Sequence, residues 1–142
     1  MPGGVVHISE AANLAIHAMV LMAADPERPL RVSRAARALP VSGNHLAKVM
    51  QRLGRAGLVT SVRGPRGGFR LRRSPAGVTL LDVYEAIEGR LPSRHCLLGR
   101  RRCAGECVLG RFVEKATSDF KVQLGRTRLS DVAGALSWGD AA

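Results

Sequence analysis

The feature that most constrains this chain is a basic, glycine-rich segment at residues 62–73, with the sequence VRGPRGGFRLRR. We predict a strand at residues 58–62, a turn at residues 64–68 and a return strand at residues 69–71. Glycine permits the positive dihedral angles of a tight turn and lets backbone amides approach an anion such as phosphate. Arginines at the tip and flank of the turn add positive charge. The segment therefore predicts a charged β-hairpin, of the kind called a wing.

Two segments before the hairpin have apolar residues at a helical period. Residues 9–24 predict a first helix, which Ser9 can cap. Residues 32–39 predict a second, shorter helix with Ser33 as its cap, and Pro40 stops it.

A third, amphipathic helix is predicted to begin at Asn44 and to end at Gly57, because a helix commonly ends at a residue with left-handed backbone angles, which glycine adopts readily. With the preceding helix and the turn at residues 40–43 it matches a helix-turn-helix, whose second helix can enter the major groove of DNA. The fold class we predict is a mainly α winged helix-turn-helix with a small β-wing. The predicted DNA-binding residues are Ser42, Asn44, His45, Lys48, Gln51, Arg52, Arg63, Arg66 and Arg70.

The overall charge agrees with a polyanionic partner. The formal net charge is +11, and 19 of the 22 basic residues are arginine, whose planar guanidinium matches phosphate geometry. No run reaches the roughly 18 apolar residues that cross a bilayer, and the first residues lack the charged start of a secretory signal. We therefore predict a cytoplasmic protein that binds double-stranded DNA and no membrane. Enzyme function is not expected, since no nucleophile–base signature or phosphate-binding loop pattern is present.

Residues 58–71 and 78–89 together strongly resemble the winged-helix regulators of the Rrf-two family, which includes IscR-like and NsrR-like members. The resemblance extends over roughly residues 9–136. It implies a homodimer that binds a palindromic operator and acts mostly as a repressor.

A long helix is predicted after the last cysteine. Its apolar stripe can either fold back on the winged part or meet a second copy of the chain. After it, Thr127 is predicted to cap a final short helix that carries Leu129, Val132, Ala133 and Leu136. The stripe consists of Leu109, Phe112, Val113, Ala116, Phe120 and Leu124. We divide the chain into a DNA-binding domain (residues 1–89), a cysteine-rich sensor loop (90–107) and a dimerisation segment (108–142).

Cys96, Cys103 and Cys107 lie in that loop, which is rich in Gly, Arg and Pro. An odd number of cysteines in a protein predicted to be cytoplasmic argues against a disulfide framework. Neighbouring arginines, and a helix start predicted near Glu106, favour thiolate chemistry. Three thiolates suit an iron-sulfur or a zinc site with a fourth ligand, and their spacing alone does not choose between the two.

The family resemblance implies a [2Fe-2S] or [4Fe-4S] cluster on these cysteines; a thiol switch and a zinc-stabilised regulator are the alternatives. IscR-like members take a histidine where this chain has Gly110, and NsrR-like members an aspartate that matches Asn13. Another fourth ligand is therefore required. His17, one helical turn after Asn13, is the candidate, and His7 and Glu10 are weaker ones. The ligand can also come from the partner subunit, solvent or a small thiol.

These observations predict an iron-sulfur-dependent transcriptional regulator. Holding or releasing the cluster would change how each DNA-binding half is oriented on the dimer axis. The signal can be nitric oxide, oxygen, iron supply or redox state. A carrier that transfers clusters is disfavoured by the complete wing.

Overall fold

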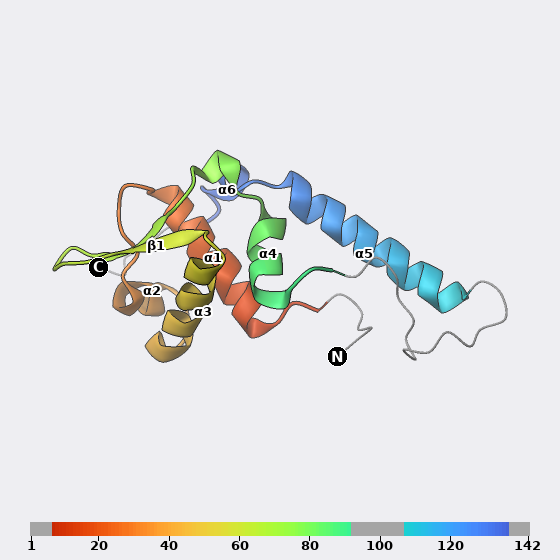
Figure 1. Cartoon of the computed structure of the whole chain (residues 1–142), viewed down its shortest axis with the longest axis horizontal. Helices are drawn as coiled ribbons and strands as arrows, with labels where there is room; N and C mark the ends of the chain where they lie inside the picture. The colour runs from red at the N-terminus through yellow and green to blue at the C-terminus, as the bar shows by residue number, and fades with distance from the viewer. Residues whose placement is uncertain (1–6, 92–106, 137–142) are drawn as a thin grey trace.

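The computed structural model describes residues 7–91 and 107–136 of the 142-residue chain. Its mainly α fold with a small antiparallel wing confirms the predicted class (Figure 1). None of the helices in the described part of the chain has the length and apolar character needed to cross a bilayer. In chain order the elements are α1 (Glu10–Ala24), α2 (Val32–Ala38), α3 (Gly43–Arg55), β1 (Val59–Val62), β2 (Gly68–Leu71), the 3-10 turn η1 (Pro75–Gly77), α4 (Leu80–Glu88), α5 (Val108–Arg126) and α6 (Leu129–Val132).

α1 runs through the centre of the core and is buried along most of its length (Figure 1). The predicted cap is confirmed, because the Ser9 hydroxyl oxygen accepts a hydrogen bond from the Ala12 amide at 3.1 Å. α3 buries only one face against the core, and this leaves its other side to solvent. The buried residues of α3 are Leu46, Val49, Met50 and Leu53.

The helix-turn-helix forms from α2 and α3, with the cap of α2 and the first residue of α3 placed differently from the prediction. α2 begins after Arg31, which makes no side-chain cap bond, so the predicted Ser33 cap is wrong. The reason is tertiary: Leu30 is held in extended conformation by a β-bridge to Phe69. α3 opens at Gly43, one residue earlier than predicted, and ends before Gly57, which has the expected positive φ of 77°.

The wing is the antiparallel pair β1–β2, in which Val59 faces Leu71 and Val62 faces Gly68. Two hydrogen bonds of 2.8 and 2.9 Å between Leu30 and Phe69 attach a further short extended segment to β2. Gly68 has a φ of 148°, and a Cβ on it would lie 2.4 Å from the Leu30 carbonyl oxygen. Glycine at this position is therefore required both by the backbone angle and by the close approach of the Leu30 strand.

α4 connects the winged part to α5. Thr79 and Asp82 cap it reciprocally, at 3.1 and 2.9 Å. Tyr84 of α4 packs edge-on against Phe120 of α5, with ring centroids 5.2 Å apart, and its hydroxyl donates to the His7 carbonyl. Burial, followed by the Glu88 carboxylate, raises the pKa of Tyr84, which favours the protonated phenol that donates this hydrogen bond.

α5 packs on α4 through Phe120, and its N-terminal end extends away from α1–α4 (Figure 1). The buried residues of α5, Gly110, Val113 and Thr117, lie in its N-terminal half. The predicted stripe is thus divided between two environments. Val113 is buried and Phe120 and Leu124 pack partly buried against the core, whereas other apolar side chains remain in solvent. We call the solvent-facing set the open face of α5; it consists of Val108, Leu109, Phe112 and Ala116.

After α5 the chain returns to the core. The Leu80 amide donates to the Thr127 carbonyl and the Leu129 amide to the Val78 carbonyl, each at 2.9 Å, and the Leu129 side chain is completely buried. The predicted Thr127 cap of the last helix is wrong, because the Thr127 hydroxyl donates back to Gln123 of α5. The amide of Arg128 instead donates a hydrogen bond to the Asp131 carboxylate.

Candidate nucleic-acid interface and metal ligands

The solvent face of α3 carries the polar residues expected to contact DNA. Asn44, Lys48 and Gln51 are exposed on it. Ser42 is also exposed and caps the helix, its hydroxyl oxygen accepting a hydrogen bond from the His45 amide at 3.2 Å. Because a hydroxyl can accept and donate at once, Ser42 can cap α3 and still donate to a phosphate.

Two of the predicted residues on α3 have partners inside the fold. The Nδ1 atom of the His45 ring lies 3.9 Å from a carboxylate oxygen of Glu10, at the start of α1. Arg52 donates from its guanidinium to the carbonyl oxygen of Ile87, near the end of α4. Sequence spacing placed both side chains off the buried stripe of α3 but gave no sign of these contacts. Arg52 fixes α3 relative to α4.

The wing presents its charge at the turn. Arg63 and Arg66 are exposed there, and the turn is closed by a 2.9 Å hydrogen bond from the Gly67 amide to the Gly64 carbonyl. Arg70 lies on β2, partly buried, and its Nε atom is buried without a hydrogen-bond partner. α2, α3 and the wing lie at the same end of the molecule, away from the free end of α5 (Figure 1).

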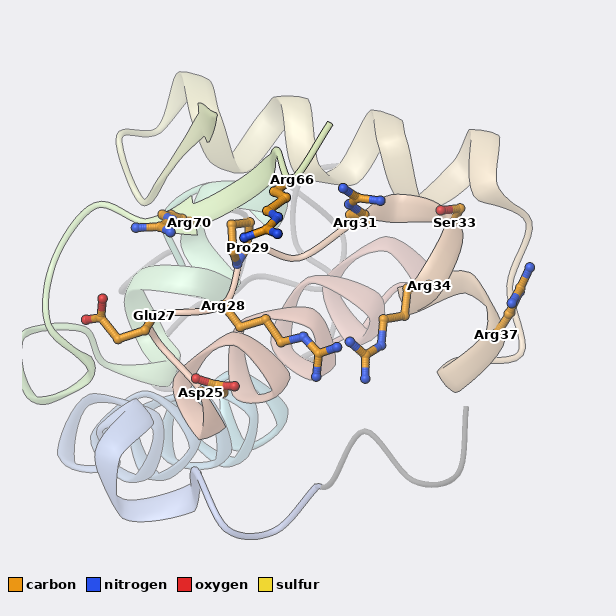
Figure 2. Close-up of a pocket in the computed structure, with 10 residues that line it drawn as sticks. All are labelled: Asp25, Glu27, Arg28, Pro29, Arg31, Ser33, Arg34, Arg37, Arg66 and Arg70. Atoms are coloured by element: carbon orange, nitrogen blue, oxygen red, sulfur yellow. The ribbon is translucent and has the colours of Figure 1, made fainter. Parts of the chain in front are cut away.

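A groove of about 1040 Å³ lies between the wing, α2 and the α1–α2 loop. Figure 2 shows arginines entering it from all three segments, with Asp25 and Glu27 together at one side and Arg37 at the far end. Arg31 also donates from Nε to the Gly67 carbonyl at 3.3 Å, so the loop and the wing turn are joined directly. We call this the arginine groove; its arginines are Arg28, Arg31, Arg34, Arg37, Arg66 and Arg70.

Four of the groove arginines were not identified from the sequence. A signal for them exists, since arginine recurs at every third position from residue 28 to residue 37. Helical periodicity missed it because the first two arginines precede α2 and only the last two lie on it. The wing that completes the groove is more than twenty residues further along the chain.

The predicted metal ligands fall in two places. Cys96 and Cys103 lie outside the described residues. Cys107 is exposed at the N-cap of α5, where its sulfur accepts a hydrogen bond from the Gly110 amide at 3.3 Å. Within residues 7–91 and 107–136, no three His, Cys, Asp or Glu side chains come together as metal ligands do.

His17 has the arrangement of a ring that is free to bind a metal through one nitrogen. Its Nδ1 atom lies 2.7 Å from the Asn13 carbonyl oxygen. Because a carbonyl oxygen only accepts, Nδ1 must carry a proton, and in the neutral ring Nε2 then keeps its lone pair. Metal-binding histidines commonly have this arrangement. In Figure 1 the N-terminal end of α5, which follows Cys107, lies well apart from α1, the helix that carries His17.

Comparisons with known proteins agree with this geometry. The profile of the Rrf2 family, described as iron-dependent transcriptional regulators, matches residues 8–135. BadM of Rhodopseudomonas palustris, named as an HTH-type transcriptional regulator, is 39% identical over 83 residues, which are 58% of this chain and 53% of BadM. This chain thus matches about half the length of that relative.

Two solved structures share nearly the whole fold. CymR, the global cysteine regulator of B. subtilis, has a TM-score of 0.77 at 26% identity, covering 92% of this chain and 98% of CymR. IscR of T. potens has a TM-score of 0.75 at 25% identity, covering 92% of this chain and 88% of IscR.

Proposed function

The chain belongs to the Rrf2 family of transcriptional regulators, and we propose that it binds a palindromic operator as a homodimer, with α3 in the major groove and the wing beside it. The observation that carries the proposal is the placement of the exposed face of α3 and the wing arginines at one end of the molecule (Figure 1). Members of this family are DNA-binding regulators and not enzymes.

We assign the dimer contact to the open face of α5. Leu109 and Phe112 are 62% and 73% exposed in the single chain, an unusual state for side chains of this size. A two-fold axis at α5 would relate the two copies of α3, which a palindrome with half-sites one DNA turn apart requires to lie about 34 Å from each other. Repression is the mode that the family resemblance implies.

Replacing Lys48 or Arg66 by alanine is expected to weaken operator binding about tenfold each, because each change removes a cation from the DNA face. Fluorescence anisotropy at matched salt measures this, on an operator selected from random-sequence duplexes. Lys121→Ala removes the same charge as Lys48→Ala from the exposed side of α5 and is expected to bind as wild type. Equal losses in K48A and K121A would indicate a nonspecific charge effect and contradict the assignment of α3.

For the sensor we propose an iron-sulfur cluster held by Cys96, Cys103, Cys107 and His17. The Cys107 sulfur stands at a helix N-terminus and the His17 Nε2 lone pair is available, so both described residues suit a metal centre. Because α1 and the N-terminal end of α5 lie apart in one chain (Figure 1), we assign the fourth ligand to the second copy across the dimer. The cluster would supply a centre reactive toward oxygen, nitric oxide or a change of redox state.

The change at the metal site would reach the DNA-binding part through the protein's own residues. Cys107 precedes α5 directly, so release of its sulfur frees the N-terminal end of the helix that we assign to the dimer contact. A change in the angle between the two α5 helices alters the separation of the two α3 helices. A coupling of about 1 to 3 kcal/mol would change operator affinity roughly 5- to 150-fold.

Wild-type protein purified without oxygen is expected to contain iron and acid-labile sulfide in equal amounts, about two or four of each per chain. Cys107→Ser is expected to lose both, because an alcohol is a poor ligand for iron. A serine hydroxyl can still cap α5, so the helix should remain folded, as circular dichroism can verify. His17→Ala is expected to alter the visible absorption spectrum.

Two other results would replace this proposal. Colourless wild-type protein with one zinc per chain would indicate a zinc-stabilised regulator. Metal-free protein whose DNA affinity follows thiol oxidation would indicate a thiol switch.

A further inference from the structure

We propose that the arginine groove binds the phosphate backbone of DNA beyond the stretch reached by α3 and the wing, which gives this chain a longer DNA footprint. The inference rests on the proposed function, since it extends the same DNA surface. It adds residues that lie outside the recognition helix and the wing: Arg28, Arg31, Arg34 and Arg37.

The groove concentrates enough positive charge to favour a polyanionic ligand. Six arginines from three separate segments line one open hollow, whereas the acidic residues of its lining, Asp25 and Glu27, sit together at one side (Figure 2). Arg28, Arg31, Arg37 and Arg66 are all exposed. Like charges gathered this way repel one another, and a chain of phosphates relieves the repulsion along its length.

The shape of the groove favours a chain of phosphates over a small anion. Its volume of about 1040 Å³ is at or above the upper end for small-ligand pockets, which enclose most of their ligand. Here the guanidinium groups are instead spread from the wing to Arg37 on α2 (Figure 2). Duplex DNA offers one negative charge per about 1.7 Å of its axis, a density that suits a row of such cations.

The groove is also continuous with the proposed DNA surface. Arg66 and Arg70 belong both to the wing and to the groove lining. Arg70 is partly buried on β2, and its Nε atom has no hydrogen-bond partner among the described residues. The bond from Arg31 to the Gly67 carbonyl fixes the loop beside the wing turn, so a backbone that passes the wing tip meets the loop next.

The test is a double substitution, Arg28→Gln with Arg37→Gln, because both side chains are exposed and neither is needed for the Arg31 contact to the wing. Binding is measured on two duplexes, a short one with the selected palindrome alone and a long one with ten added base pairs of unrelated sequence on each side. The matched control, Lys121→Gln with Arg126→Gln, removes the same charge from α5.

On the long duplex the groove variant is expected to bind about tenfold more weakly than wild type, and the slope of log K against log salt should fall by roughly 3 to 4 per dimer. On the short duplex it should equal wild type, and the control should equal wild type on both. Hydroxyl-radical footprinting of wild type should show backbone protection outside the palindrome, an independent readout if the variant folds poorly.

Several results would overturn the inference. In one such result, wild type binds both duplexes, the groove variant loses no affinity, and the DNA backbone outside the palindrome is not protected. The groove would then not belong to the DNA surface, while the proposed function would stand. Inorganic pyrophosphate could also raise the Tm of wild type but not of the groove variant, while the two proteins bind the long duplex equally well. That result would assign the groove to a small phosphate ligand. A wild type that binds neither duplex would reject the proposed function itself.

Discussion

A Phe112→Glu protein is expected to be monomeric and to bind the full palindrome at least about 100-fold more weakly than wild type. Phe112 lies at the centre of the open face of α5 and is 73% exposed in the single chain. In a symmetric dimer the substituted residue would bring two carboxylates into an apolar contact, at a large desolvation cost. The affinity loss follows because each half would bind its half-site alone, without the effective concentration that the other half provides.

The fold of the single chain should survive this change. Phe112 packs against none of the buried core, and glutamate is a good helix former. Ser118→Glu is the matched control, since Ser118 is exposed on α5 outside the open face. Sedimentation equilibrium gives the mass and anisotropy the affinity for whole and half operators. A dimeric F112E protein would show that another surface joins the two copies.

Gly68→Ala is expected to destabilise the protein by about 3 kcal/mol or more, which corresponds to a fall in Tm of roughly 10 °C. Two effects add. The φ of 148° is strained for any L side chain, and the new Cβ would lie 2.4 Å from the Leu30 carbonyl oxygen. Since backbone and not a flexible side chain occupies that space, relief requires breaking the Leu30–Phe69 bridge that attaches the α1–α2 loop to the wing.

Alanine substitutions at two further glycines separate the backbone strain from the close approach to Leu30. Gly64 also has a positive φ, of 108°, but has open space around it, so Gly64→Ala should cost only about 1 kcal/mol of strain. Gly134 has neither feature, and Gly134→Ala should be nearly neutral. Thermal unfolding followed by circular dichroism ranks the three variants. A G68A protein as stable as G64A would mean that the close approach to Leu30 costs nothing.

Local patterns were sufficient where local chemistry decides the structure. Ser9 as cap, the end of α3 before Gly57 and the strands on either side of the glycine-rich turn all depend on neighbours within a few residues. The errors lie where distant residues decide. Ser33 does not cap α2 because Leu30 pairs with Phe69, and the tertiary bridge between residues 78–80 and 127–129 governs Thr127.

The candidate sites could likewise be predicted only where neighbouring residues decide the structure. Exposed residues of α3 and the wing could be identified from periodicity and turn chemistry, because each element presents its own residues. The arginine groove could not, since it needs a loop, a helix and a hairpin brought together by the fold. The contact between Arg52 and Ile87 was hidden for the same reason, because 35 residues separate the two in the chain.

The return of the chain to Leu129 has a consequence for the order of events during synthesis. The core around α1 includes the fully buried side chain of Leu129, which lies after α5, so the winged part cannot complete its packing until residue 129 has left the ribosome. A partly made chain therefore has no finished winged domain with which to occupy an operator. By the time the recognition helix is firmly held, the helix that we assign to pairing has already been made.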